Sequence, residues 1–161
     1  MTIWIITLIT LVAIDQISKI WVSSALEIGE TIPVIKDFFH ITYTRNTGVL
    51  FGGLEGTASE YFWVFLIFAT AATIIFGYMF IKSDFKDKRL FVFRLSLVLL
   101  IAGSIGNAID RAVQIDHAVV DMIDFRGIWQ YIFNFADTFL NVGIFFFFID
   151  LFFLEKKRVA S

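Results

Sequence analysis

The chain has 161 residues, a net charge of −2 and a hydrophobic share of 58%. So large an apolar share in so short a chain exceeds that of a soluble domain and predicts an integral membrane protein with one domain, residues 1–161. The small net charge gives no sign of a nucleic-acid partner. The lack of cysteine excludes disulfides, thiolate metal sites and cysteine catalysis. His40 and His117 are too far apart in sequence for a helical zinc motif.

Four apolar runs are each long enough to cross a hydrocarbon core of about 30 Å as a helix. We expect these helices over roughly residues 3–22, 61–81, 90–109 and 138–154. The first run resembles a signal peptide, but it holds Asp15 and Lys19 and no small-residue cleavage site follows cleanly, so we expect it to be retained. The fold class that follows is an all-α membrane protein, built as a four-helix transmembrane bundle.

Lysine and arginine cluster in the short second connection and in the C-terminal tail, whereas the other two connections carry few. Cytoplasmic loops are enriched in these residues, so both termini and the second connection are expected to be cytoplasmic. The connections over residues 23–60 and 111–136 then lie outside. The motifs described below fall on or near this outer face.

The first outer connection is too long for a simple link. Residues 38–44 alternate apolar and polar side chains and are rich in β-branched and aromatic types, which predicts a short strand. A small sheet at the membrane surface would pair backbone groups that lipid cannot. Gly48, Gly52, Gly53 and Gly56 indicate turns or close backbone approach.

Asp15 and Lys19 are four residues apart in the first helix, so they share a face and can form an ion pair. Pairing is the usual way in which membrane helices tolerate charged residues, and a structural role is therefore expected. The alternative is a hydrolase with Ser18 as nucleophile and Lys19 as base. Adjacent helical residues do not face one another, which argues against that alternative.

Gly103, Asn107 and Arg111 recur every four residues near the end of the third helix. Gly103 and Gly106 permit close packing of helices. Asn107 and Arg111 project polar groups from the same stripe. They could form hydrogen bonds between helices, or they could hold a substrate carbonyl or a lipid headgroup, and the sequence leaves both readings open.

Two carboxylates are expected near membrane depth, where ionisable groups are energetically costly and usually indicate a functional site. Asp121 follows an apolar segment, and its apolar neighbours should disfavour ionisation. Asp137 opens the fourth helix and is expected to be its N-cap, where a carboxylate is stabilised. One charged and one protonated carboxyl group could activate a water and polarise a scissile carbonyl. Asp124 competes with Asp121 for this role, and residue chemistry does not choose between them.

Five short motifs carry a family resemblance. In chain order they are DQISK at 15–19, RNTG at 45–48, GNAIDR at 106–111, VVD at 119–121 and FNFAD at 133–137. With these motifs the chain resembles the bacterial lipoprotein signal peptidases (signal peptidase II) over nearly its whole length. The stretch over residues 112–118 looks longer than is usual in that family, and it lacks the glycine commonly found before VVD.

The resemblance implies an intramembrane aspartyl endopeptidase with a small extracytoplasmic β-sheet, the cradle, and with no metal or cofactor. Its substrates would be diacylglyceryl-modified prolipoproteins, cut on the amino side of the lipidated cysteine. Asp121 and Asp137 would form the catalytic dyad, and Asp15 and Lys19 would support it. Positions that bind substrate would be Asn46, Gly48, Asn107, Arg111 and Asn134. We expect a monomer in the bacterial cytoplasmic membrane, in contact with lipid and with no nucleic acid.

Two rival functions remain at the level of sequence. A small transporter or proton channel could use an intramembrane charge relay through Asp15, Lys19, Asp110, Arg111 and Asp150. Such a relay should lie near the bilayer midplane, whereas most of these residues gather at the outer edge. Asp150 is expected at the cytoplasmic interface, close to Lys156. The second rival is a non-catalytic scaffold that needs only the packing glycines.

Overall fold

The computed structural model describes residues 1–47 and 58–159. Its long helices are α1 (Thr2–Ala25), α2 (Ala58–Lys82), α3 (Phe91–Val113) and α4 (Phe135–Ile149). The chain after α4 continues through a π-helical stretch, η3 (Asp150–Leu154), into α5 (Glu155–Val159), and a single 3₁₀ turn, η2 (Lys88–Leu90), precedes α3. Within the described residues, four segments are long and apolar enough to cross a membrane: Thr2–Ala25, Phe62–Lys82, Lys88–Val113 and Phe135–Leu154. The predicted four-helix membrane fold is confirmed.

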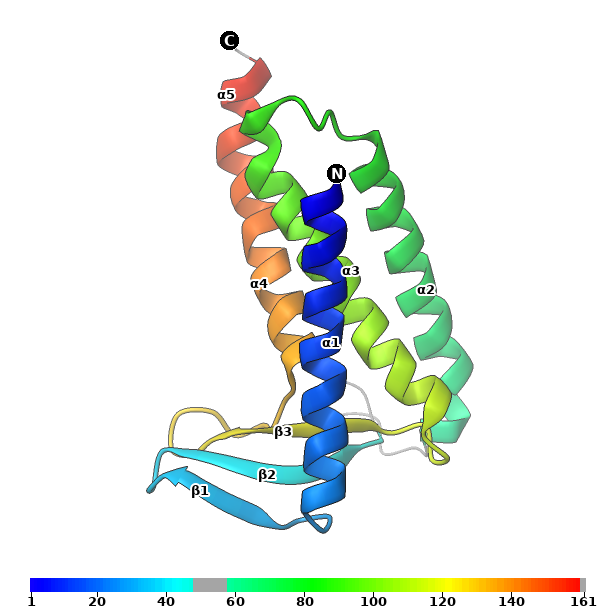
Figure 1. The fold of residues 1–161 in the computed structure, drawn as a ribbon, viewed down its shortest axis with the longest axis vertical. Coiled ribbons are helices and arrows are strands. Elements are labelled where there is room, and N and C mark those ends of the chain that lie inside the picture. Colours follow the sequence, from blue (N-terminus) through cyan, green and yellow to red (C-terminus); the bar gives the residue numbers. More distant parts are fainter. Residues whose placement is uncertain (48–57, 160–161) are drawn as a thin grey trace.

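Helix α3 is the centre of the bundle, and α1, α2 and α4 pack around it (Figure 1). In the most apolar stretch of α3, 61% of the residues are buried. In the most apolar stretch of α2 none is buried, so α2 presents most of its surface to lipid. Close contact with α4 depends on small residues. A Cβ at Gly103 would lie 2.5 Å from the backbone oxygen of Ala136, and one at Gly143 would lie 2.9 Å from Leu100 Cγ. The close packing predicted for Gly103 is confirmed.

Three antiparallel strands form one sheet in the order β1 (Thr31–Ile35), β2 (Phe39–Asn46), β3 (Val119–Phe125). Strand β2 contains most of the segment predicted from the sequence. The sheet lies across one end of the helical bundle, and both chain termini lie at the other end (Figure 1).

The sheet is held to the bundle by a small apolar core. Val22 near the end of α1 and Leu26 just after it pack with Tyr43 of β2 and with Val120 and Met122 of β3. All five are at most 8% exposed. This contact fixes β3 beside α1. It therefore places Asp121, which lies between Val120 and Met122, at the junction of sheet and bundle.

Asp150 is buried near the end of the bundle that holds the termini. It is 3% exposed, and its two oxygens accept hydrogen bonds of 2.7 and 2.6 Å from the Arg158 guanidinium. Asp150 lies close to the C-terminal tail, as expected, and the basic residue that it pairs with is Arg158. The helix continues far enough beyond η3 to bring Arg158 back over Asp150, and a bidentate pair then neutralises the buried carboxylate.

Replacing Gly103 by alanine should destabilise the protein, because the new methyl group would overlap the first turn of α4. Overpacking of this kind costs about 1–3 kcal/mol. Gly77→Ala is the matched control, because a Cβ at Gly77 meets nothing within 4 Å. Thermal unfolding in detergent should show a lower Tm for Gly103→Ala alone. Equal Tm values for the two variants would contradict the close packing of α3 on α4.

Candidate active site

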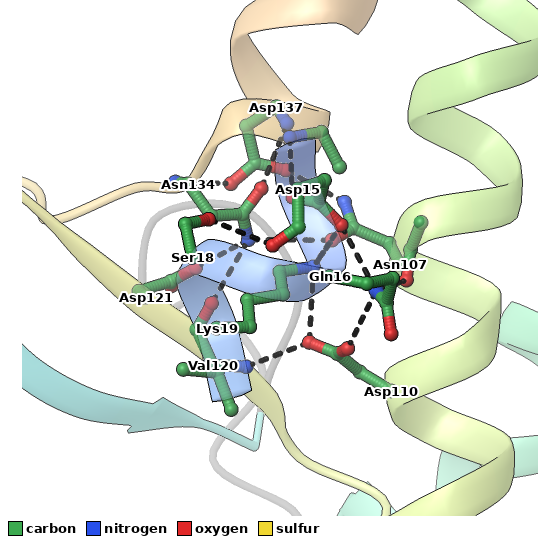
Figure 2. A network of polar contacts seen from close by, with 12 residues as sticks. Asp15, Gln16, Ser18, Lys19, Asn107, Asp110, Val120, Asp121, Asn134 and Asp137 are labelled. Carbon is green, nitrogen blue, oxygen red and sulfur yellow. Dashed lines mark hydrogen bonds and ion pairs between the residues drawn. The ribbon is translucent and has the colours of Figure 1, made fainter. Parts of the chain in front are cut away.

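Polar side chains from α1, α3, β3 and the start of α4 converge where the sheet meets the bundle (Figure 2). Lys19 lies in their midst and is 2% exposed. Its Nζ is 2.9 Å from Asp15 Oδ2 and 3.0 Å from Asp110 Oδ2, and it donates to Asn107 Oδ1 at 3.1 Å. The predicted ion pair between Asp15 and Lys19 is confirmed. Sequence reasoning did not find that Asp110 is a second partner.

The two carboxylates around Lys19 each hold a further element. Asp15 Oδ1 accepts a hydrogen bond of 2.8 Å from the backbone N–H of Ala136, in the first turn of α4. Asp110 Oδ2 accepts one of 3.0 Å from the backbone N–H of Val120 in β3. The start of α4 and the middle of β3 are therefore both positioned from the same buried ammonium group.

Gln16 and Gly106 complete the contact between α1 and α3. The Gln16 amide donates to Asp15 Oδ2, Asp110 Oδ1 and the backbone oxygen of Gly106 at 3.0–3.2 Å. A Cβ at Gly106 would lie 2.5 Å from Asp15 Oδ2 and 3.0 Å from Ala136 Cβ. The close packing predicted for Gly106 is confirmed, and its main contact is with the polar cluster.

Asn134, and not Asp137, is the N-cap of α4. The helix begins at Phe135, three residues earlier than predicted, so Asp137 becomes the third helical residue. Asn134 Oδ1 accepts from the Asp137 N–H at 2.9 Å, and Asp137 Oδ2 accepts from the Asn134 N–H at 3.4 Å, which makes a reciprocal capping box. The prediction of Asp137 as N-cap is wrong, because the sequence FNFAD offers two capping residues that belong to one motif.

Asn134 also joins the two candidate catalytic carboxyl groups. Its Nδ2 donates to Asp121 Oδ1 at 2.7 Å, while its Oδ1 and backbone hold Asp137. Asn107 Nδ2 donates to Asp137 Oδ1 at 2.7 Å, so Asn107 connects Asp137 to Lys19. Asp121 and Asp137 thus share one fully buried amide, although one comes from a strand and the other from a helix.

Asp121 is 2% exposed, and burial raises the pKa of its carboxyl group to about 7. The negative charge of Asp137 contributes to this rise, and hydrogen bonds from Asn46 and Asn134 oppose it. The Asn46 amide donates to Asp121 Oδ2 at 3.0 Å from the end of β2. The direction expected from the apolar neighbours of Asp121 is confirmed.

Asp124 lies apart from this arrangement, and Ser18 joins it through the backbone of Asp15 (Figure 2). Asp124 Oδ2 accepts from Thr42 Oγ1 at 2.8 Å and from Arg126 Nε at 3.1 Å, within the sheet. Ser18 Oγ donates to the backbone oxygen of Asp15 in its own helix at 2.7 Å. The geometry therefore groups Asp121 with Asp137, and Ser18 is engaged with the backbone of its own helix.

Arg111 lies at the edge of the site, half-buried. Its guanidinium donates to the backbone oxygen of Asn107 at 3.2 Å and lies 4.8 Å from the centroid of the Phe65 ring. No sequence signal pointed to Phe65, which belongs to an apolar helix. Gly48, predicted to bind substrate, lies outside the described residues, as do Gly52, Gly53 and Gly56.

A family model described as "Signal peptidase (SPase) II" matches residues 7–153 of this chain. The chain belongs to the signal peptidase II family. It is 43% identical over 158 residues to a lipoprotein signal peptidase of Fusobacterium nucleatum subsp. nucleatum, covering 98% of this chain and 91% of the relative. It is 42% identical over 155 residues to one of Clostridioides difficile (strain 630), covering 96% and 97%.

Solved structures agree with this membership of the signal peptidase II family. A bacterial membrane enzyme solved by the in meso method at 2.3 Å resolution superposes with a TM-score of 0.81 at 32% identity, covering 94% of this chain and 88% of that one. A second, solved at 1.9 Å, gives a TM-score of 0.80 at 31% identity, with 95% and 94% covered. The family resemblance read from the five motifs is confirmed.

Lys19→Met in this signal peptidase II family member should be strongly destabilising, because it leaves Asp15 and Asp110 buried without their cation. Breaking a buried pair costs about 3–5 kcal/mol. Arg89→Met is the control, since Arg89 pairs with Asp87 at the exposed surface and should leave stability essentially unchanged. Reversible unfolding in mixed micelles measures both. A Lys19→Met protein as stable as the control would show that the buried network does not hold the fold.

Proposed function

We propose that this chain removes signal peptides from prolipoproteins as an intramembrane aspartyl endopeptidase, with Asp121 and Asp137 as its catalytic pair. Membership of the signal peptidase II family supports lipoprotein processing. The observation that carries the aspartyl mechanism is the sharing of Asn134 by two carboxyl groups, of which one has a pKa near 7.

In this mechanism Asp137 is the base and Asp121 the acid. Asp137 removes a proton from a water as its oxygen attacks the scissile carbonyl carbon, and protonated Asp121 gives its proton to the carbonyl oxygen. Breakdown of the tetrahedral diol breaks the C–N bond, and the proton held by Asp137 passes to the leaving amine. One of the diol hydroxyls then returns its proton to Asp121 as the new carboxylic acid forms, which restores both groups.

The substrate in this proposal is a diacylglyceryl-modified prolipoprotein, cut on the amino side of its lipidated cysteine. Its acyl chains stay in the bilayer, so the scissile bond arrives from the membrane side. Asn46, Asn107, Arg111 and Asn134 surround the carboxyl pair and would orient the peptide, which contributes much of the rate. The Asp15–Lys19 pair acts as support.

The proposal places the enzyme in the bacterial cytoplasmic membrane as a monomer, with both termini cytoplasmic and the sheet outside. The distribution of Lys and Arg supports this orientation, as does the position of the termini at the end of the bundle opposite the sheet. Catalysis would need no metal, cofactor or nucleic acid.

A transporter relay through Asp150 gains no support from the described residues. Asp150 pairs with Arg158 near the end of the bundle that holds the termini, whereas Lys19, Asp15 and Asp110 form a separate cluster beside the sheet.

Cleavage of a diacylglyceryl-modified prolipoprotein peptide by the purified protein tests the proposed function. Asp121→Asn and Asp137→Asn should each lower kcat/KM by about 10²–10⁴-fold, since each removes a proton-transfer group. Asp124→Asn is the matched control and should stay close to wild type. Loss of cleavage with Asp124→Asn and retention with Asp121→Asn would move the dyad to Asp124. A wild-type protein that cuts nothing, where a C. difficile relative does, would end the proposal.

The pH dependence of kcat/KM follows from the protonated state required of Asp121. Activity should fall as the pH rises through about 7, because Asp121 then loses the proton that it donates. The hydrogen bond from Asn46 lowers the pKa of Asp121, so Asn46→Ala should raise that pKa and move the alkaline limb to higher pH. Asn141→Ala is the control, because the Asn141 amide donates to the backbone oxygen of Asp137 and not to either carboxyl group among the residues that the structure describes. If the alkaline limb of the kcat/KM profile stays in place or moves to lower pH in Asn46→Ala, the assignment of Asp121 as the acid is contradicted.

A further inference from the structure

Helix α2 turns two aromatic rings toward the active site. Phe62 and Phe65 are both half-buried, on the side of α2 that packs on α3. Their neighbours Trp63 and Phe68 are 67% and 71% exposed on the lipid-facing side. Phe65 contacts Arg111 near the end of α3, and Phe62 contacts His117 in the segment that follows α3.

Phe65 contacts the side chain of Arg111. The guanidinium carbon lies 4.8 Å from the ring centroid, a cation–π distance. Arg111 also lies in the electrostatic field of Asp110, Asp121 and Asp137. The Phe65 ring thus gives the guanidinium an attractive partner in addition to these carboxylates.

Phe62 contacts the backbone of Arg111 through His117. The Phe62 and His117 rings stack with centroids 4.1 Å apart and an interplanar angle of 26°. His117 Nδ1 lies 2.7 Å from the backbone oxygen of Arg111. A carbonyl can only accept, so Nδ1 carries the proton and donates it. The last carbonyls of a helix lack partners within it, and His117 satisfies this one from a left-handed conformation with φ 55°.

His117 belongs to the stretch over residues 112–118, which looks longer than is usual in the family. The neighbouring Asp116 forms an ion pair with Arg45 of β2. The stretch is thus fastened to the sheet by Asp116 and to α2 by His117, and its path beyond α3 is fixed on both sides.

We propose that Phe62 and Phe65 are positioning residues for Arg111, Phe65 holding its guanidinium and Phe62, through His117, its backbone. This inference rests on the proposed role of Arg111 in binding substrate. It gives α2, otherwise a lipid-facing helix, a specific contribution to cleavage.

Phe65→Leu tests the side-chain contact, with Phe68→Leu on the lipid-facing side of α2 as matched control. Loss of a cation–π contact predicts a fall of about 3- to 10-fold in kcat/KM for Phe65→Leu. Phe68→Leu should match wild type, and Phe65→Trp, which keeps a strong π face, should retain most of the activity. A Phe65→Trp as impaired as Phe65→Leu, or an equal loss with Phe68→Leu, would overturn the proposal.

A double-substitution cycle separates positioning from general packing. In an Arg111→Gln background, measured with enzyme in excess so that slow cleavage can be followed, Phe65→Leu should cause no further loss. The same loss in both backgrounds would show that the ring acts on packing and not through Arg111. Failure of the wild type to cleave would instead reject the proposed function itself, and this inference with it.

The backbone contact is tested at His117. His117→Gly permits the left-handed conformation but removes the ring and its hydrogen bond, and it should also lower kcat/KM about 3- to 10-fold, the loss of one hydrogen bond. His117→Asn tolerates the same conformation and can donate to the same carbonyl, so it should recover part of the activity. Full activity in His117→Gly would remove Phe62 and His117 from the proposal.

Discussion

The structure depends on one buried ammonium group. Lys19 has almost no access to water, so its charge must be balanced by protein groups. Asp15 and Asp110 balance the charge, Asn107 accepts a further hydrogen bond from the ammonium group, and each of the three also binds another part of the site. Asp15 holds the start of α4, Asp110 holds β3, and Asn107 holds Asp137. The relative position of the two catalytic candidates is therefore a consequence of where Lys19 finds its partners.

The environments of the two carboxyl groups differ because different elements carry them. Asp121 projects from a strand whose flanking residues are packed against α1, so burial dominates its ionisation. Asp137 projects from the first turn of a helix and accepts hydrogen bonds from Asn107 and from the backbone of Asn134. Both groups stand on regular elements, which hold a site more rigidly than loops do. Asn134 fixes the position of one carboxyl group relative to the other, because its side-chain amide contacts both residues.

The sequence predicted those features that depend on short spacings or on composition. Hydropathy located the four helices, and the i, i+4 spacing located the Asp15–Lys19 pair. The apolar neighbours of Asp121 indicated the direction in which the pKa of its carboxyl group is shifted. The strands β1 and β3 escaped prediction individually. Strand β1 contains Pro33 and is mostly exposed. In β3 the two polar residues, Asp121 and Asp124, are three positions apart and both faces are largely buried, so neither strand shows an alternating pattern.

The sequence also did not predict side-chain contacts between residues that are not close neighbours in the chain. Arg158 reaches Asp150 only because the helix continues past η3, and Phe65 meets Arg111 only because α2 packs on α3. Nothing in the local sequence of either partner signals the other. The start of α4 was misplaced for a different reason, since Asn134 and Asp137 are both good capping residues and act together.

The position of Asp15 one turn before Lys19 also bears on how the protein is made. Synthesis proceeds from the N-terminus, so α1 can enter the bilayer before Asn107 and Asp110 of α3 exist. A lone lysine in a nascent helix would face the full cost of insertion. Because Asp15 lies on the same helix, Lys19 enters already paired, and the later arrival of α3 adds a second carboxylate to a charge that is already accommodated. The order of elements along the chain is thus compatible with assembling a buried ionic centre step by step within a membrane.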